Sequence, residues 1–313
     1  MQKILPPQTK DFLPVYLLLL GVMAFWGVNV VMIKYLTQYF TPSALAAVRL
    51  TAATLLLVPL VYRRYGWVKL PKREWFPILG VAFCCITFHQ LALSWGLSVT
   101  SGTHGVLILA LGPLFTTILA ARFANEPYTF NKTASVILGL SGIILIVARH
   151  DGTGSAGFQG DMLIFLAMLL YVIGTLCVKK STATIPPLVV TAYSHIIGSL
   201  GLLVIAAVTS PVWIATPFTG ATALGVFLCS AWGATALGAL GWNTGIQRIG
   251  ASTASLFLSL STLIGLISSA VFLEELLTWH HYLSLFLVLT GVGIGTGILQ
   301  RSVKHWGLQQ TKA

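Results

Sequence analysis

Carboxylates can relay protons or bind cations, and this chain has only seven of them. They are Asp11, Glu74, Glu126, Asp151, Asp161, Glu274 and Glu275. Each lies at the end of a long apolar stretch or between two stretches, whereas a proton relay inside a membrane needs an ionisable group at depth. Thr129 and Thr278 follow Glu126 and Glu275 by three residues and begin the next apolar stretch. This spacing favours structural anchoring, in which threonine caps a helix and the carboxylate stabilises its positive end.

A second group of polar residues lies within the apolar stretches. Arg49 falls about seven residues into one of them, which is about 10 Å deep if the stretch is a helix in a membrane. A charge at that depth should face the protein interior and not lipid. Its five donors could serve a cavity or gate, or could tie helix ends to backbone carbonyls, and both roles stay open. For His89 and His195 the sequence favours a hydrogen-bonded core position over proton coupling.

A serine between glycines raises the possibility of catalysis. Gly139-Leu140-Ser141-Gly142 copies the Gly-x-Ser-Gly string of intramembrane serine proteases. The residues 149 positions later are Val288-Leu289-Thr290-Gly291, so small residues recur while the first glycine and the serine do not. Packing between helices explains this recurrence better than a nucleophile does. An intramembrane enzyme is therefore an alternative, and we expect no catalytic residue.

No spacing typical of a metal or cofactor site occurs. There is no His-Glu-x-x-His string, and His280 and His281 are adjacent at a predicted helix start. The glycine-rich segment 151–157 lacks the Gly-Lys-Ser/Thr ending of a phosphate loop, so a linker is expected there. Four cysteines lie in apolar stretches and should be free thiols. We expect neither a metal nor a cofactor.

Long apolar stretches must position these residues. The chain has 313 residues, of which 56% are hydrophobic and 8% charged, and its mean hydropathy is +0.89. About 20 apolar residues in a helix cross a hydrocarbon core about 30 Å thick. Ten stretches qualify, so the sequence predicts an all-α membrane protein with ten transmembrane helices. Their ranges are 14–36, 43–62, 75–97, 103–123, 130–148, 160–178, 187–209, 219–246, 252–273 and 280–299.

The sequence is duplicated. Adding 149 to Glu126 and Gly142 gives Glu275 and Gly291 without a gap, and Gly96 maps onto Gly245. Matches run from about residue 92 to 147, which is longer than chance repeats usually reach. Five stretches in each half predict that the second half enters the membrane from the opposite side, as inverted repeats do in transporters. The expected repeats are residues 12–148 and 160–299.

Lys and Arg are distributed unevenly between the two sides of these stretches. If the N-terminus is cytoplasmic, fifteen lie inside, and only Lys34 and Arg149 lie outside. This bias is typical of the positive-inside rule and predicts that both termini are cytoplasmic. It also explains the basic loop at residues 63–73, so we expect no nucleic-acid partner.

Several motifs resemble one known family. The chain is similar to EamA-type members of the drug/metabolite transporter superfamily over nearly its whole length. The motifs are Trp26-Gly27-Val28-Asn29, the segment from Pro42 to Arg49, Leu93-Ser94-Trp95-Gly96-Leu97, Pro113 and Glu126. The second half is looser: Tyr171 replaces Trp26, Thr262 replaces Pro113, and Ser194 with His195 stands where Arg49 would be. The resemblance implies ten helices, a central cavity and export of small metabolites, amino acids among them.

Mostly aromatic and small polar residues are expected to line such a cavity. The candidates are Trp26, Asn29, Arg49, His89, Gln90, Trp95, Tyr171, Tyr193, His195, Trp242 and Asn243. An apolar wall with few polar groups suits small, partly hydrophobic zwitterions. The structural candidates are Pro113, Glu126, Thr129, Glu275 and Thr278.

The sequence predicts a multi-pass secondary transporter of the plasma membrane. It should export amino acids or related metabolites by alternating access, with an importer or facilitator as a further alternative. The expected partners are the lipid bilayer and a small-molecule substrate. Glycines at 291, 293, 295 and 297 predict close helix contact, either within a monomer or in a homodimer.

Overall fold

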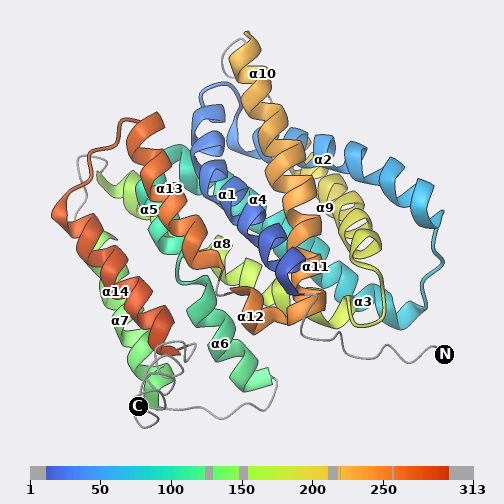
Figure 1. Cartoon of the computed structure of the whole chain (residues 1–313). Helices are drawn as coiled ribbons and strands as arrows, with labels where there is room; N and C mark the ends of the chain where they lie inside the picture. Colours follow the sequence, from blue (N-terminus) through green and yellow to red (C-terminus); the bar gives the residue numbers. More distant parts are fainter. Residues whose placement is uncertain are drawn as a thin grey trace.

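A computed structural model describes residues 12–123, 130–147, 154–210, 218, 220–255 and 257–295. These residues form helices joined by short connections, and none of them forms a β-strand element (Figure 1). The first half contains α1 (Phe12–Leu36), α2 (Pro42–Tyr65), α3 (Lys72–Gly80), α4 (His89–Val99), α5 (Gly102–Leu109), α6 (Gly112–Phe123) and α7 (Phe130–Val147). The second contains α8 (Gly154–Ser181), α9 (Pro187–Thr209), α10 (Ala221–Leu228), α11 (Gly238–Ile249), α12 (Ala251–Ser255), α13 (Leu258–Phe272) and α14 (Trp279–Gly295).

Two π-helices make the third helical stretch of each half continuous. The segment η2 (Val81–Phe88) joins α3 to α4, and η3 (Cys229–Leu237) joins α10 to α11. In each segment a threonine hydroxyl donates to the carbonyl five residues earlier, Thr87 to Ala82 at 3.1 Å and Thr235 to Ser230 at 2.8 Å. The two threonines are 148 positions apart, so both copies of the repeat widen their helix at the same place.

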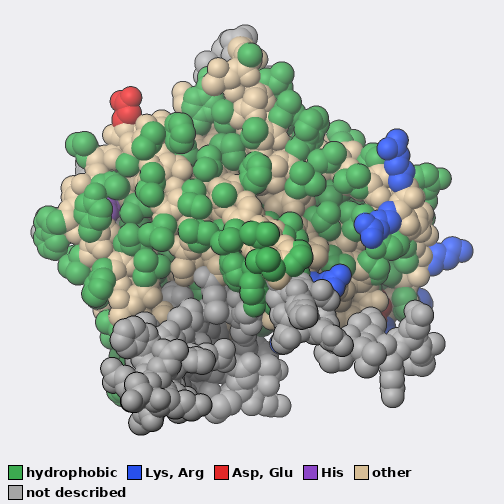
Figure 2. All heavy atoms as spheres, in the orientation of Figure 1, with side chains coloured by type: hydrophobic (Ala, Val, Ile, Leu, Met, Phe, Trp, Pro, Cys, Tyr) green, Lys and Arg blue, Asp and Glu red, His purple; other side chains and the backbone are tan. Residues whose placement is uncertain are grey.

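Six of the described helical stretches are long and apolar enough to cross a membrane. They are Leu13–Leu36, Pro42–Tyr65, Lys72–Val99, Gly157–Ser181, Pro187–Thr209 and Ala221–Ile249, and two shorter apolar helices span Gly102–Thr116 and Leu258–Phe272. Large apolar side chains such as Leu55 and Val204 on these helices, and Phe286 on α14, are exposed. Figure 2 shows apolar side chains covering most of the visible face. Such a surface suits lipid, and the chain is a multi-pass membrane protein.

The two halves pack against each other through equivalent helices. α2 packs along α9, and α7 lies beside α14 (Figure 1). Other contacts join non-equivalent helices of the two halves. α4 of the first half packs on α8 of the second, and α11 of the second half packs on α1 of the first. Glycines permit the close approach, since a Cβ atom on Gly96 would meet Ile164 at 2.5 Å and one on Gly245 would meet Leu19 at 2.6 Å. This packing fits the two-repeat organisation that the duplicated sequence predicts.

Two stretches predicted as continuous helices are broken. Residues 103–123 fold as α5 and α6 with a turn at 110–111, and residues 252–273 fold as α12 and α13. Pro113 explains the first break, because it cannot donate to the carbonyl of Leu109. Tight turns close both breaks: the amide of Leu111 donates to Ile108, and that of Phe257 donates to Ala254, each at 3.1 Å.

Candidate functional site

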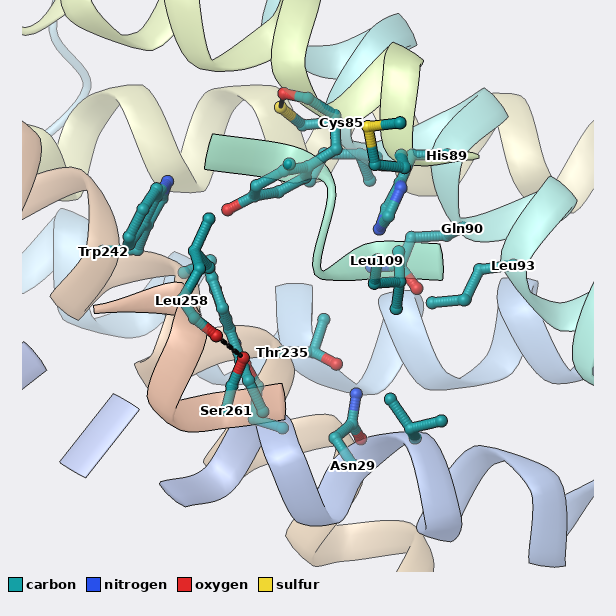
Figure 3. A pocket seen from close by; sticks show the side chains of 18 of the residues that line it. Asn29, Cys85, His89, Gln90, Leu93, Leu109, Thr235, Trp242, Leu258 and Ser261 are labelled. Atoms are coloured by element: carbon teal, nitrogen blue, oxygen red, sulfur yellow. Dashed lines mark hydrogen bonds between the residues drawn. The ribbon is translucent and has the colours of Figure 1, made fainter. Parts of the chain in front are cut away.

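A cavity of about 150 Å³ lies between the two halves. Eight of the residues predicted from sequence line it, from α1, α4, α8, α9 and α11 (Figure 3 shows part of the lining): Trp26, Asn29, His89, Gln90, Tyr171, His195, Trp242 and Asn243. Among the described residues, no Asp, Glu, Lys or Arg lines the cavity. An engineered apolar cavity of about this volume holds a benzene ring, so one ring-sized group fits here.

Equivalent positions of the two repeats form opposite walls. Leu109 and Leu258, which are 149 positions apart, both line the cavity beside the two helix breaks. The same offset relates further lining pairs: Gln90 and Ala239, Leu93 and Trp242, and Gly112 and Ser261. The cavity therefore lies on the pseudo-symmetry between the halves, where transporters built from repeats hold their substrate.

Three aromatic side chains form one wall. The ring centroids of Trp26 and Trp242 are 5.3 Å apart, and those of Trp26 and Tyr171 are 5.8 Å apart in an edge-to-face arrangement. The indole N–H of Trp26 donates to the carbonyl of Ala234 at 2.9 Å, which fixes that ring against the π-helix η3. A rigid aromatic wall of this kind contacts the apolar part of a ligand.

A chain of hydrogen bonds runs behind the opposite wall. Arg49 donates from Nη2 to Oε1 of Gln90, and from Nη1 to the hydroxyl of Ser230 at 3.1 Å. That hydroxyl in turn donates to Oδ1 of Asn29 at 2.6 Å. Arg49 is completely buried, and its Nε has no hydrogen-bond partner. Among the described residues no carboxylate lies within salt-bridge distance of this arginine.

Both cavity histidines are held through Nδ1. His89 bonds the carbonyl of Ala167 at 2.8 Å, and His195 bonds the carbonyl of Thr191 at 2.8 Å. Since a carbonyl only accepts, Nδ1 carries the proton in each ring, and Nε2 of a neutral ring is an acceptor. The Nε2 atom of His195 is buried without a partner. Thr191 also accepts from the amide of Asn243 at 2.8 Å through its hydroxyl.

Three residues predicted for the cavity lie elsewhere. Arg49 does not line the cavity but sits behind Asn29 and Gln90, because its guanidinium donates to Gln90 and Ser230 inside the wall. Trp95 is 42% exposed on the outer face of α4, where its N–H donates to Ser43. Tyr193 lies at the end of the molecule where α2 and α3 are connected, because its hydroxyl bonds both the N–H and the carbonyl of Val68. Sequence places these residues on helices but does not fix which face of each helix is turned inward.

Of the residues predicted as anchors, Pro113, Glu275 and Thr278 are described, and none of these three lines the cavity. The carboxylate of Glu275 accepts the N–H groups of Gly102 and Thr103, each at 2.7 Å, and the hydroxyl of Thr103. It thus caps α5 of the other half and not the helix that follows it. Thr278 precedes α14 and donates its N–H to Nδ1 of His281 at 3.0 Å. Pro113 lies at the start of α6, whereas Glu126 and Thr129 lie outside the described residues.

Sequence reasoning missed part of the lining. Ser261 and Thr262 line the cavity below the second helix break, and Thr235 lines it from η3. The offset of 149 could have indicated Ser261 and Thr262, because it relates them to Gly112 and Pro113 of the first half. No comparable signal marks the π-helices. Within the described ranges no group of three or more His, Cys, Asp or Glu could hold a metal ion.

Comparison with known proteins identifies the family. The model of the EamA-like transporter family matches residues 13–148 and 158–296, which is most of both halves. This chain belongs to the EamA-like transporter family. The resemblance predicted from the motifs is confirmed, and an EamA-like chain is a transporter and not an enzyme. Consistent with this, the hydroxyl of Ser141 donates to the carbonyl of Ile137 on its own helix at 2.8 Å.

Similar proteins span the whole chain. The uncharacterized transporter YyaM of Bacillus subtilis is 31% identical over 300 residues, which cover 92% of this EamA-like chain and 95% of the relative. An uncharacterized transporter of Archaeoglobus fulgidus is 27% identical and covers 87% of this chain and 95% of its own. A solved crystal structure superposes with a TM-score of 0.66 over 92% of this chain and 98% of its own, at 17% identity, which shows a shared fold.

Proposed function

We propose that this EamA-like transporter exports small metabolites, such as amino acids or related compounds, across the plasma membrane by alternating access. The observation that carries the proposal is the central cavity with repeat-related residues on its opposite walls. A rigid aromatic wall and a few polar groups suit a small, partly hydrophobic solute. The site consists of the cavity residues named above, with Arg49 behind them.

The proposed architecture has ten membrane spans in two inverted repeats. Each half supplies five spans if its π-containing stretch and its broken helix are each counted as one, and the repeats are residues 12–148 and 160–299. An odd number of spans per half inverts the second repeat. The exchange of packing partners between α4 and α8, and between α11 and α1, supports this arrangement.

Alternating access requires the halves to rock around the cavity. The breaks between α5 and α6 and between α12 and α13, together with the two π-helices, interrupt regular hydrogen bonding beside the cavity, and interrupted helices are where transporters bend. Two arrangements related by the repeat symmetry then open the cavity to one side at a time. The proposed orientation places both termini and the α2–α3 connection in the cytoplasm.

Cysteine labelling tests alternating access. Leu93 of α4 and Asn243 of α11 line the cavity, and in the proposed topology the C-terminal ends of these two helices point toward opposite faces of the membrane. In a chain with its four native cysteines replaced, a solute that is transported should change labelling of Leu93→Cys and Asn243→Cys by an impermeant thiol reagent in opposite senses. An exposed lipid-facing position, Leu55→Cys, is the control that should not respond. Simultaneous labelling of both cavity positions from one face would indicate an open pore and contradict the proposal.

Direction is tested by metabolite profiling. Cells that produce the transporter should release more of at least one small metabolite than cells without it, and inverted membrane vesicles should accumulate the same compound. Accumulation only in right-side-out vesicles would favour an importer or facilitator and overturn export.

A further inference from the structure

We propose that the cavity selects an organic anion, with its carboxylate bound to Asn29 and Gln90 and its apolar body against the aromatic wall. This inference rests on the proposed transport function and specifies the substrate class of the same site. It starts from the buried cation Arg49, whose hydrogen-bond partners are the neutral side chains of Gln90 and Ser230.

The hydrogen bonds within this wall leave the amide N–H donors of Asn29 and Gln90 free for a ligand. An amide side chain has one acceptor oxygen and two N–H donors. The oxygen of Gln90 accepts from Arg49, and that of Asn29 accepts from Ser230, so both acceptors are used inside the wall. Their amide nitrogens make no hydrogen bond within the described part of the chain. Figure 3 shows the amide nitrogen of Asn29 directed into the space between the labelled side chains.

Further unpaired groups in the cavity are mostly donors. Trp242 and Tyr171 line the cavity, and the indole N–H of Trp242 and the hydroxyl of Tyr171 are buried without partners. The unpaired Nε2 of His195 is the acceptor among them. Buried donors without partners are costly, so a ligand with acceptor oxygens relieves that cost. A carboxylate supplies two such oxygens and up to four lone-pair sites.

Electrostatics favours a negative ligand over a positive one. The guanidinium of Arg49 donates directly to Gln90 and Ser230. Among the described residues no carboxylate lies close enough to neutralise its positive charge. A carboxylate bound to the two amides would lie about 7 Å from that charge, and at an effective dielectric constant of about 20 the attraction corresponds to a preference of more than about tenfold. A ligand cation would be repelled by the same field.

The aromatic wall by itself could also attract a cation through its ring faces. Here, however, the rings of Trp26, Tyr171 and Trp242 pack edge-on or tilted against one another, with centroids 5.3 to 6.3 Å apart. A cage would surround the cation with ring faces and add a nearby acid, and the lining contains no acid. The wall therefore suits the uncharged body of the ligand.

Three compounds of nearly equal shape test the charge preference. The purified full-length chain in detergent is titrated calorimetrically with 3-phenylpropionate, 3-phenylpropionamide and 3-phenylpropylamine at neutral pH. We expect the anion to bind at least about tenfold more tightly than the amide, in line with the estimate above, and the amine to bind most weakly. Equal or tighter binding of the amine, or binding of none of the three, would overturn the inference. Opposite labelling responses at Leu93→Cys and Asn243→Cys would still leave the proposed transport function standing.

Substitutions assign the preference to one charge. Arg49→Gln should bring the anion and the amide to similar affinity, whereas Arg248→Gln, which removes an exposed arginine at the end of α11, should leave the ratio unchanged. Since loss of a buried arginine can prevent folding, Asn29→Asp offers a second route. Its carboxylate beside Ser230 should cancel the field of Arg49 and abolish the anion preference. A ratio unchanged in Asn29→Asp, with Arg49 intact, would contradict the assignment.

Discussion

Two carboxylates tie the two halves together. Glu275 follows α13 of the second half, and its oxygens cap the first amides of α5 in the first half. Asp161 makes a similar tie, since it accepts from the hydroxyl of Thr100 at 2.6 Å and pairs with His104 at 3.0 Å. Charged acceptors at helix N-termini form strong hydrogen bonds. The described acidic residues in these positions therefore hold helix ends and do not face the cavity.

Replacing Glu275 should lower stability more than it lowers substrate affinity. Glu275→Gln removes the charge from three hydrogen bonds, and we expect a loss of about 1–3 kcal/mol, seen as a lower apparent melting temperature in detergent. Glu274→Gln is the matched control, because that neighbouring side chain is exposed. An unchanged melting temperature with a large loss of affinity would contradict the anchoring role.

Ser141 should be dispensable for transport. Its hydroxyl is on an exposed residue and bonds only its own helix, so Ser141→Ala should keep full activity in the vesicle assay. Gly142→Leu is the informative comparison, since its side chain would meet the carbonyl of Ser284 at 3.0 Å and Val288 at 3.1 Å. Complete loss of transport in Ser141→Ala at normal membrane abundance would return a catalytic role to consideration.

At the scale of elements, equivalent glycines set the distance between the halves. Gly96 of α4 faces Ile164 of α8, and Gly245 of α11 faces Leu19 of α1. The two contacts differ in one respect: a Cβ atom on Gly96 would also approach the carbonyl of Gly160 at 2.9 Å. A side chain can move aside or be shortened, whereas a helix backbone cannot move without its neighbours.

Shortening the neighbouring side chain should therefore rescue the two glycine variants to different extents. Gly96→Ala and Gly245→Ala should each destabilise the fold by about 1–3 kcal/mol through overpacking. Adding Leu19→Ala should restore most of the stability of Gly245→Ala, while adding Ile164→Ala should restore little to Gly96→Ala. Thermal unfolding of the singles and doubles measures the coupling, and equal rescue in both pairs would contradict the backbone contact.

At the scale of the whole molecule, charge sets orientation and the repeats set the cavity. In Figure 2 the exposed Lys and Arg side chains gather on the side where α2 ends and α3 begins. By the positive-inside rule, we propose that this side faces the cytoplasm. The cavity then lies at mid-depth, since its lining comes from the middle of most helices and from both halves.

Orientation is measured with terminal reporters. A C-terminal fusion to a reporter that works only in the cytoplasm should be active, and one to a reporter that works only outside should be inactive. Moving the positive charge is the control: replacing Arg63, Arg64, Lys69, Lys72 and Arg73 by Gln should weaken the bias. Activity of only the outside reporter in the native chain would reverse the proposed topology.

Composition and the internal offset determined the helical membrane class and the duplication, the motifs indicated the family, and the sequence named eight of the residues that line the cavity. These follow because lipid requires long apolar helices and because a duplicated sequence keeps small residues at repeated contacts. The broken helices, the π-helices and the burial of Arg49 behind Asn29 and Gln90 were decided only by the tertiary structure. Which face of a uniformly apolar helix turns inward depends on packing against other helices, and the helices around Trp95 and Tyr193 carry no hydrophobic stripe that would reveal it.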